Sequence, residues 1–499
     1  MAYNPLMNTQ AFTAIRIAPG DDVAVALRDL APGDICCGHD FSLPAAQAVA
    51  AGHKVALRAI VPGERVCKYG APIGVAAKAI ARGEWVHTHN LRSDLGGVQA
   101  YQWRASPGGE VARASASFSG FMRADGRVGV RNGVWILPTV GCVNERAARI
   151  AAAARPFVHG SVDAVTAFSH PYGCSQMAED QEAFRRALAA LAGHPNAGGV
   201  LLLGLGCENS GIEQLRPYLG ANPRLRTLVC QDVEDEIGEG VRLVRELIDE
   251  AARDVRETVD ASRLVVGLKC GGSDGFSGIT ANPAIGACSD WIVGCGGTSV
   301  LTEVPEMFGA EEALFARCCN RETFEKAAAM VNGFKEYFLS NGMAVDENPS
   351  PGNRAGGITT LAEKALGCTQ KSGTAPVCGV LAYGEPVRRS GLHLLCAPGN
   401  DLVSASALAF SGAQIVLFST GRGTPLSGPV PTVKIASNSQ IAARKPGWID
   451  VDAGSVLRGE TVAQAGERLF RHVLAVASGA PVKGEEGLSM AFWKRGVTL

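Results

Sequence analysis

The stretch LVVGLKCGGSDGFSGITANPAIG, residues 264–286, decides the fold of this 499-residue chain. It opens with an apolar run, residues 264–268, that is typical of a buried strand. The seven residues that follow, Lys269 to Gly275, hold three glycines together with a cation, a thiol, a hydroxyl and a carboxylate. Because glycine can take positive φ and lets a ligand approach the backbone closely, we expect this loop to form a binding site.

The end of the same stretch predicts a helix that Asn282 caps and that begins at Pro283. A strand, a glycine loop and a helix N-terminus in succession would place an anionic ligand at the carboxyl edge of a sheet. An ordinary tight turn is the alternative, but a loop so dense in polar groups favours a site.

The composition limits the kinds of protein that this chain can be. Hydrophobic residues make up 46% of it and charged residues 19%, which is enough to build large cores. At roughly 150 residues a domain, the length predicts about three domains. The 47 basic and 48 acidic residues give a net charge of −1, which indicates no nucleic-acid partner and no polybasic membrane anchor. No apolar run approaches the roughly 20 residues that span a bilayer, and no secretory signal is recognisable, so we expect a cytoplasmic protein.

Residues 1–97 are predicted to form a small β-rich domain, because short alternating runs are separated by Pro-Gly turns. One helix is expected in it, over residues 44–51. In an extended segment His87 and His89 would point the same way, and two imidazoles on one face could bind a metal or move protons. A pair of exposed histidines at a strand end is the alternative. Residues 98–119 lack periodicity, which indicates a linker.

Strands alternate with helices from residue 120 onward, which predicts parallel sheets in two α/β parts, residues 120–260 and 261–499. Cysteines recur after the predicted strands: Cys142, Cys174 and Cys207 follow three of them and Cys270 follows a fourth. Thiolates suit iron or an iron–sulfur cluster, so either these loops converge on a metal or the thiols are small fillers beneath a pocket. The 15 cysteines include no C-x-x-C pair and should be mostly reduced.

Two further loops carry candidate groups. Glu303 and Glu306 lie at the end of a predicted strand and could bind a hard cation or transfer protons; two solvated acids are the alternative. Arg422 lies between two glycines, where a guanidinium can bind a carboxylate close to the backbone. Because these groups follow strands, we expect the ligand at the carboxyl edge of the sheet.

Motifs spread along the chain carry a resemblance: KYGAPIG (68–74), VHTHN (86–90), HPYGCSQ (170–176), GLGCEN (204–209), TEVPEMFGAE (302–311) and STGRGTP (419–425). With residues 264–286 they cover the chain almost end to end, and it resembles the altronate dehydratase and galactarate dehydratase family of sugar-acid hydro-lyases. The resemblance implies a small N-terminal SAF-type β domain followed by a two-part α/β catalytic region. It also implies a divalent metal, Fe²⁺ or else Mn²⁺, and dehydration of a sugar acid to a 2-keto-3-deoxy acid.

A related branch of the family divides its domains between chains and eliminates sulfite from sulfolactate, and the fused layout here favours the sugar-acid branch. D-Altronate is the expected substrate; dehydration of galactarate, or a sulfo-lyase reaction, is the alternative. A protein that binds a sugar acid without turnover is a third reading, against which the acid–base groups in the loops argue. A homodimer is a possible assembly.

The elimination needs a base for the proton next to the carboxylate, a cation for the developing enediolate and an acid for the leaving hydroxyl. We expect the base to be Lys269, whose pKa burial can lower, or one of the histidines at 87 and 89. The acid is expected to be His170 or Asp274. The predicted substrate-binding residues are Lys54, Gly271, Gly272, Ser273, Asn282 and Arg422. The predicted metal ligands are His87, His89, Cys142, Cys174, Cys207 and Glu208, with an iron–sulfur cluster as the alternative to a single ion.

Overall fold

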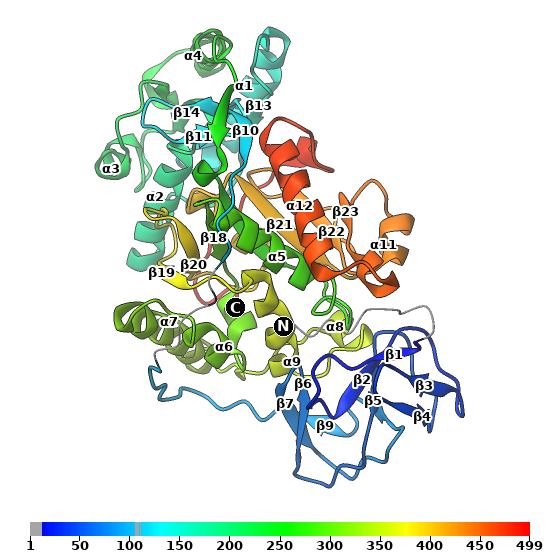
Figure 1. Cartoon of the computed structure of the whole chain (residues 1–499). Helices are drawn as coiled ribbons and strands as arrows, with labels where there is room; N and C mark the ends of the chain where they lie inside the picture. Colours follow the sequence, from blue (N-terminus) through cyan, green and yellow to red (C-terminus); the bar gives the residue numbers. More distant parts are fainter. Residues whose placement is uncertain (1–11, 105–108, 110) are drawn as a thin grey trace.

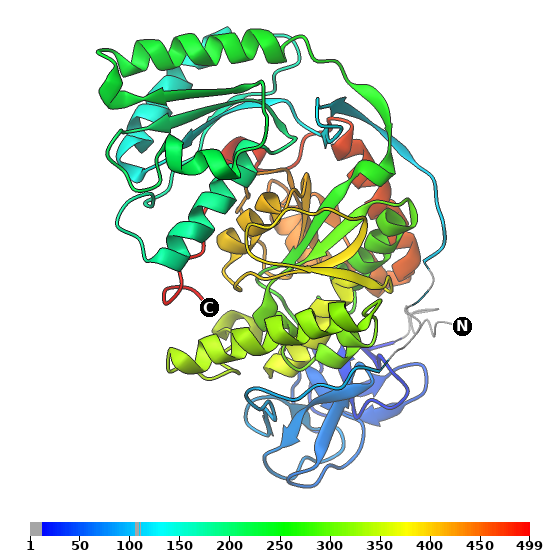
Figure 2. The same ribbon diagram turned by 90° about the vertical axis from the view of Figure 1, so that its left-hand side faces the viewer.

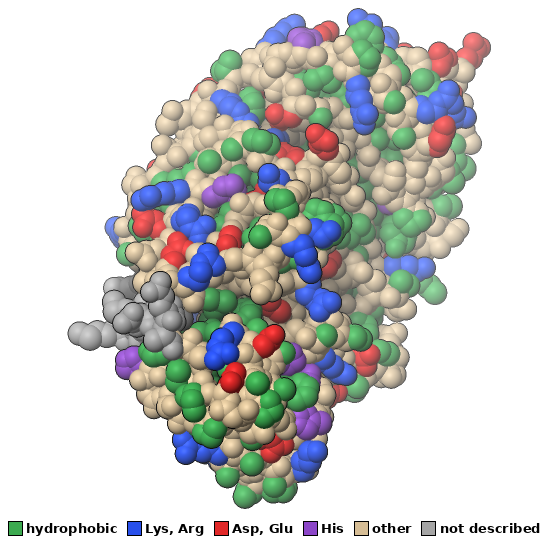
Figure 3. Space-filling view, turned by 90° about the vertical axis from the view of Figure 1, so that its right-hand side faces the viewer, with side chains coloured by type: hydrophobic (Ala, Val, Ile, Leu, Met, Phe, Trp, Pro, Cys, Tyr) green, Lys and Arg blue, Asp and Glu red, His purple; other side chains and the backbone are tan. Residues whose placement is uncertain are grey.

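The computed structural model describes residues 12–104, 109 and 111–499. Three bodies lie in a row: an N-terminal β-rich unit at one end, a second domain at the other end, and the C-terminal domain between them (Figures 1 and 2). Charged side chains of both signs are interspersed on the face shown in Figure 3. None of the helices in the described ranges is long and apolar enough to cross a lipid bilayer.

The N-terminal unit consists of short antiparallel strands. Its largest sheet has the order β1-β2-β5-β8, beside a three-stranded sheet β6-β7-β9 and the hairpin β3-β4. The strands are β1 (Ala14–Ile15), β2 (Val23–Ala26), β3 (Ile35–Cys37), β4 (Ser42–Pro44), β5 (Lys54–Ala56), β6 (Arg65–Lys68), β7 (Ala71–Ala76), β8 (Trp85–Val86) and β9 (Leu91–Arg92). The helix predicted over residues 44–51 is wrong: Val49 forms an isolated β-bridge with Leu30, and this tertiary pairing overrides helix propensity.

A ribbon of three antiparallel strands joins the second domain to the C-terminal domain. It is formed by β10 (Ser117–Met122), β11 (Val128–Gly129) and β16 (Glu257–Asp260), in the order β11-β10-β16. The predicted linker over residues 98–119 therefore includes the start of a strand. The sequence ARASASFS at residues 112–119 is mostly Ala and Ser, with Phe118 as its one strand-favouring residue, so it gives a weak strand signal.

The second domain is a parallel sheet with the order β13-β12-β14-β15. Alternate residues of β12 face opposite sides: Val134 and Ile136 pack with α1 and α4, whereas Trp135 and Leu137 pack with α2. The elements are β12 (Gly133–Pro138), α1 (Asn144–Ala154), β13 (Val165–Ala167), α2 (Ala178–Ala192), β14 (Ala197–Gly204), α3 (Ile212–Leu215), β15 (Leu225–Val229) and α4 (Glu236–Ala251).

The C-terminal domain is built on seven parallel strands in the order β19-β20-β18-β17-β21-β22-β23, with β17 at the centre. The strands are β17 (Val265–Cys270), β18 (Thr298–Leu301), β19 (Val377–Leu381), β20 (Gly391–Leu395), β21 (Ile415–Thr420), β22 (Thr432–Ala436) and β23 (Val451–Asp452). A side chain at Gly267 of β17 would collide with Leu408, since its Cβ would lie 2.8 Å from Leu408 Cδ1. Glycine there lets α10 pack directly on the central strand.

Helices cover this sheet and extend it toward the N-terminal unit. The helix after β17 begins at Ala281, two residues before Pro283, so Asn282 lies inside its first turn and does not cap it. Helix α5 packs along α12 (Figure 1), and α9 faces the N-terminal unit. The helices are α5 (Ala281–Gly294), α6 (Glu311–Phe315), α7 (Arg321–Ser340), α8 (Pro351–Ala355), α9 (Leu361–Cys368), α10 (Asp401–Phe410), α11 (Ser439–Arg444) and α12 (Val462–Ala477).

Candidate active site

A buried ion-pair cluster lies where β17 and β18 end. Lys269 is fully buried, and its Nζ lies 2.9 Å from Glu303 Oε1 and 2.8 Å from Asp401 Oδ1 while also donating to Ser404 Oγ at 3.0 Å. Burial alone would lower the pKa of Lys269, but the two carboxylates offset it and hold the pKa above its ordinary value. This arrangement favours the ammonium form of Lys269, in which all three protons are donated to neighbouring oxygens. Its role as the base stays a prediction.

Glu303 combines burial with a strained backbone. It has a φ of +69°, in the left-handed region that a non-glycine residue adopts at a cost. Its second carboxylate oxygen accepts a hydrogen bond from the backbone amide of Cys270 at 3.0 Å. Burial raises the pKa of Glu303 to about 7. Strain and a displaced pKa in one buried residue are typical of a functional site.

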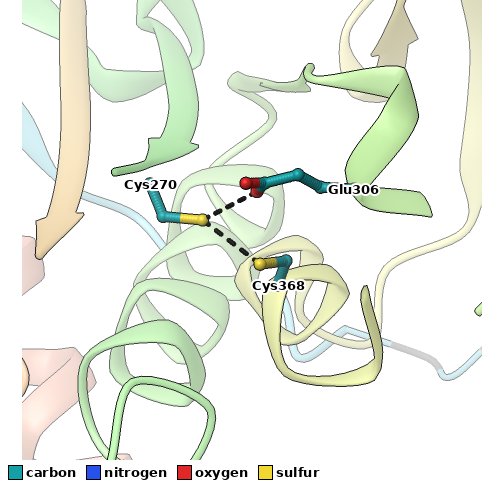
Figure 4. Close-up of side chains that lie close together, drawn as sticks. All are labelled: Cys270, Glu306 and Cys368. Atoms are coloured by element: carbon teal, nitrogen blue, oxygen red, sulfur yellow. Dashed lines mark hydrogen bonds between the residues drawn. The ribbon is translucent and has the colours of Figure 1, made fainter. Parts of the chain in front are cut away.

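Two thiols and a carboxylate meet next to this cluster (Figure 4). Cys270 Sγ lies 3.0 Å from Glu306 Oε2 and 3.3 Å from Cys368 Sγ. Within the part of the chain that the structure describes, these three form the one group of His, Cys, Asp or Glu ligand atoms close enough to share an ion. Two lysines lie against this group of ligand atoms and provide positive charge: Lys371 Nζ is 2.6 Å from Cys270 Sγ, and Lys364 Nζ is 2.8 Å from Glu306 Oε1.

A second buried carboxylate joins the N-terminal unit to the C-terminal domain. Glu363 of α9 accepts from Lys54 Nζ at 2.8 Å and from Lys68 Nζ at 2.8 Å. Lys54 also donates to Gly357 O and Thr359 Oγ1, each at 2.8 Å, so its three protons are all used. Burial lowers the pKa of Lys54 to about 8. Lys54 therefore connects the two domains, and its role in substrate binding stays a prediction.

The histidines of the N-terminal unit lie at the same interface, but not on an extended segment. Residues 87–90 form a turn, and the rings of His87 and His89 both pack on Trp85, with centroids 5.1 and 5.0 Å away. His87 Nδ1 lies 2.9 Å from Thr359 Oγ1. Burial, assisted by Lys54, lowers the pKa of His87 to about 4, so its imidazole is neutral at pH 7. His89 is exposed.

A pocket lies between the N-terminal unit and the loop after β17, and Tyr69, Ser273, Asn282, Lys364 and Cys368 contribute to its wall. The Ser273 hydroxyl is buried and has no hydrogen-bond partner among the described residues. Tyr69 has a φ of +63°. A buried hydroxyl without a partner is costly unless a water or a ligand oxygen completes it. The cavity here is about 10 Å³, room for about one such group, so Ser273 is a candidate contact for a single ligand oxygen.

Of the other residues predicted to bind substrate, the structure supports some and not others. Arg422 is exposed at the edge, with a long 3.4 Å contact to Gly352 O. The amide of Gly271 donates to Ser419 O at 3.0 Å, which leaves the amides of Gly272 and Ser273 as candidates. Asn282 donates to Gly367 O at 2.9 Å, and its amide oxygen accepts from the Ser419 hydroxyl, so it connects α5, α9 and β21 at the wall of this pocket.

Asp274 organises the loop after β17. Its carboxylate accepts from the Ser277 hydroxyl at 2.9 Å, from the Ser437 hydroxyl at 2.8 Å and from Asn438 Nδ2 at 2.9 Å, and also from two backbone amides. Four of these bonds are to Oδ1 and one is to Oδ2, so Asp274 holds the loop in position. Its role as the acid stays a prediction.

The glycine loop passes directly over Asp401. A Cβ at Gly271 would lie 2.5 Å from Asp401 Oδ1, so only glycine fits there. The Asp401 side chain is 39% exposed, unlike its partner Lys269. Asp401 lines a cleft whose other wall includes Tyr172 of the second domain. Asp401 is thus the member of this cluster whose side chain is accessible to solvent.

His170 belongs to the core of the second domain. Its Nε2 lies 2.7 Å from Pro138 O, and its Nδ1 accepts from the Tyr172 amide at 3.1 Å. Burial lowers the pKa of His170 to about 4. Both ring nitrogens are engaged by backbone groups, so His170 holds its own loop in this arrangement. Its role as the acid stays a prediction.

The predicted metal ligands do not come together around one ion. No group that includes them meets the distance condition for a shared ion in the described ranges. His87 and His89 belong to the N-terminal unit and the cysteines at 142, 174 and 207 to the second domain, at opposite ends of the molecule (Figures 1 and 2). Glu208 accepts from the amides of Leu205 and Gly206, at 3.1 and 2.7 Å, so it shapes its own loop.

Five charged or thiol residues of this region were not predicted from the sequence: Lys68, Glu363, Cys368, Lys371 and Asp401. One signal could have revealed part of this set: α9 is buried on every side although its sequence, LAEKALGC, has Glu and Lys at its centre. Charged residues in a wholly buried helix are found when they are paired.

Fold and site together define an α/β enzyme with a small β domain fastened beside a buried acid–base cluster. Three family descriptions match in sequence order: the altronate/galactarate dehydratase SAF domain at residues 12–94, the D-galactarate dehydratase/altronate hydrolase second domain at 120–252, and the D-galactarate/altronate dehydratase C-terminal domain at 261–498. The chain belongs to the altronate/galactarate dehydratase family.

Characterised relatives align along nearly the whole chain. It is 48% identical to altronate dehydratase of Escherichia coli (strain K12) over 97% of this chain and 99% of that protein. It is 46% identical to altronate dehydratase of Bacillus subtilis (strain 168), with the same coverage. The galactarate dehydratase (L-threo-forming) of Escherichia coli (strain K12) is 32% identical over 93% of this chain and 92% of that protein.

Proposed function

We propose that this protein dehydrates D-altronate to a 2-keto-3-deoxy sugar acid. The observation that carries the proposal is the full-length similarity to two altronate dehydratases, 46–48% identical, against 32% for the galactarate enzyme. The unpartnered Ser273 hydroxyl beside a buried lysine–carboxylate cluster supports a polar substrate at the carboxyl edge of the seven-stranded sheet. The enzyme would work in the cytoplasm, and a homodimer is part of the same proposal.

The carboxylate of the substrate would bind at the glycine loop. Arg422 offers a guanidinium at the rim, and the Ser273 hydroxyl and the amides of Gly272 and Ser273 offer donors from the floor. Charge-assisted hydrogen bonds of this kind become stronger as negative charge develops on the enediolate, so they lower the barrier to removal of the neighbouring proton.

We assign the base to Asp401, with His87 as the alternative. Asp401 is a partly exposed carboxylate whose position Lys269 fixes, and His87 is an imidazole kept neutral by burial. Lys269 is a positioning residue in this scheme, because its three protons hold Glu303, Asp401 and Ser404. A base must be accessible to the substrate. The Asp401 side chain is 39% exposed, whereas Lys269 is fully buried and donates all three of its protons.

A divalent metal, Fe²⁺ or else Mn²⁺, belongs to the proposal as the Lewis acid that polarises a substrate oxygen. The group Cys270, Glu306 and Cys368 has soft donors that suit iron. Lys371 nevertheless lies against Cys270 Sγ, where its ammonium supplies the positive charge that a metal ion would bring. As arranged here, these three residues do not fit a divalent ion, and no step of the reaction is routed through them.

Anaerobic turnover with a panel of acids tests the proposal. The purified chain would be incubated with D-altronate, other hexonates, galactarate and sulfolactate, with and without Fe²⁺ or Mn²⁺, while 2-keto-3-deoxy acid and sulfite are measured. We expect metal-dependent product from altronate at a kcat/KM at least tenfold above that for galactarate. Preference for galactarate would instead identify the chain as a galactarate dehydratase. Release of sulfite from sulfolactate, without dehydration of any sugar acid, would contradict the dehydratase proposal.

A further inference from the structure

Two cysteines lie side by side where the chain meets the outermost strand of the seven-stranded sheet. Cys318 forms an isolated parallel β-bridge with Val377, the first residue of β19. The amide of Cys319 donates to Val377 O at 3.1 Å, and the amide of Val377 donates to Arg317 O at 2.9 Å. In this register the next pair across the bridge is Cys319 and Cys378. Adjacent strands are about 4.8 Å apart, within the Cα separation of about 4.4–6.8 Å that a disulfide spans.

A β-bulge determines where the Cys378 side chain points. Its neighbours Val377 and Gly379 pair with consecutive residues of β20, so Cys378 is an extra residue in β19. A bulge changes the direction of the side chain that it carries. Gly391 at the start of β20 provides room for this thiol, because a Cβ there would lie 2.8 Å from Cys378 Sγ. The backbone therefore gives the Cys378 thiol a place of its own beside the bridge.

The thiols of this region differ in accessibility. Cys319 is exposed, with its Sγ 3.6 Å from Thr323 Oγ1, and Cys378 is half-buried. Burial and the neighbouring Cys319 thiol raise the pKa of Cys378, and a hydrogen bond between the two side chains acts in the same direction. Cys318 is buried instead, and its Sγ donates to Leu314 O at 3.9 Å. An oxidant in solution therefore meets Cys319 first, and Cys378 is the thiol beside it.

The pair stands at the base of a long excursion of the chain. Residues 319–378 leave the edge of the sheet, carry α7, α8 and α9, and return at β19. Arg317 holds the two ends of this excursion together through hydrogen bonds to Gly373 O and Ala375 O, at 2.6 and 3.1 Å. We propose that Cys319 and Cys378 form a reversible disulfide under oxidation by hydrogen peroxide, which closes the base of the excursion covalently.

The oxidation takes place in two balanced steps. The sulfur of Cys319 attacks one oxygen of hydrogen peroxide and the O–O bond breaks, which leaves a sulfenic acid and releases one water. The sulfur of Cys378 then attacks the sulfenic sulfur, so that the S–S bond forms and a second water leaves. The two thiols lose two electrons and two protons, and the peroxide gains them. Thiol–disulfide exchange with a small thiol reverses the bond, as is usual for disulfides in the cytoplasm.

Peptide mapping under non-reducing conditions detects this bond directly. The folded full-length chain would be treated with hydrogen peroxide, its remaining thiols alkylated, and the product denatured and digested with trypsin. Cleavage after Arg and Lys releases Cys319 in residues 318–321 and Cys378 in residues 372–388. We expect these two peptides to be joined through Cys319 and Cys378, and dithiothreitol to separate them. Because the bond closes a long loop, the oxidised wild type should unfold at least about 3 °C above oxidised Cys319→Ser.

The matched control is Cys318→Ala, which removes the other thiol of the same tryptic peptide and should keep both the link and the higher unfolding temperature. Three results would overturn the proposal: peptides that stay separate after oxidation, a link that runs through Cys318, or an equal unfolding temperature for oxidised wild type and oxidised Cys319→Ser. Neither readout depends on turnover, so the outcome is independent of whether the chain dehydrates altronate.

Discussion

The two parallel sheets of this protein place reactive side chains at their carboxyl edges in opposite ways. In the C-terminal domain the groups are buried and paired, as Lys269 is with Glu303, and a cation is already present beside each anion. In the second domain three thiols stand exposed on adjoining loops. The carboxyl edges of the two sheets therefore differ: one carries buried, paired charges, and the other carries thiols exposed to solvent.

Breaking the buried cluster should have the largest effect. Lys269→Ala leaves Glu303 buried without its cation, so we expect a loss of about 3–5 kcal/mol in the free energy of unfolding and at least about 10²-fold in kcat, because Asp401 loses its partner. Urea unfolding and altronate turnover measure both. Lys335→Met, which breaks the buried Lys335–Glu311 pair elsewhere, is the control. It should destabilise the fold and leave kcat within about threefold, and an equal kcat loss in both variants would contradict the assignment.

Removing one unpartnered hydroxyl should lower activity without lowering stability. Ser273→Ala deletes a buried group that has no partner among the described residues, so unfolding should change by less than about 0.5 kcal/mol. If the hydroxyl binds substrate, KM should rise about tenfold. Ser289 is also buried and lacks a partner among the residues described. Ser289→Ala should leave the free energy of unfolding and KM unchanged. An equal rise in KM for the two variants would contradict a role of Ser273 in substrate binding.

The pH dependence of stability should distinguish His170 from an acid–base residue. Burial lowers its folded pKa to about 4 from 6.5, so between these values the unfolded chain binds the extra proton. Its contribution is therefore complete above about pH 6.5 and lost as the pH falls through 4. In His170→Asn the slope of unfolding free energy against pH should fall by up to about 1.4 kcal/mol per pH unit in that window. The exposed His159, as His159→Asn, should leave the slope unchanged.

The smallest effect is expected at the rim of the N-terminal unit. His89 is exposed and packs only on Trp85 in the contacts described, so His89→Ala should change kcat less than about twofold. His87→Gln removes the imidazole that faces Thr359 and, if His87 is the base, should lower kcat at least about tenfold. A pH–rate profile decides between the two base candidates, since only the loss of the true base removes the acidic limb.

Local sequence patterns could predict the elements and the edge on which the site lies. The apolar run 264–268 and the glycine loop after it identify β17, and parallel strands then place Asp274, Arg422 and Glu303 on one edge. The predicted helix start at Pro283 is displaced to Ala281, because Asn282 bonds to Gly367 of α9 instead of capping its own helix.

Partners that lie far apart in the chain could not be predicted this way. Lys269 meets Asp401 across 132 residues, and Lys54 meets Glu363 across 309. From the sequence, only the effect of burial on Lys269 could be considered, and burial lowers the pKa of a lysine. In the folded chain Glu303 and Asp401 lie beside Lys269 and raise its pKa. The sign of that shift, and hence the role of Lys269, depends on contacts that only the fold defines.

The sharing of Glu363 between Lys54 and Lys68 has a consequence for assembly. The anion belongs to α9 of the C-terminal domain, and both cations belong to the N-terminal unit. A C-terminal domain that forms without its β-rich unit carries an uncompensated negative charge in the helix beside the substrate pocket. Docking of the small unit therefore supplies the counter-charge of Glu363, because its carboxylate has these two cations against it only in a complete molecule.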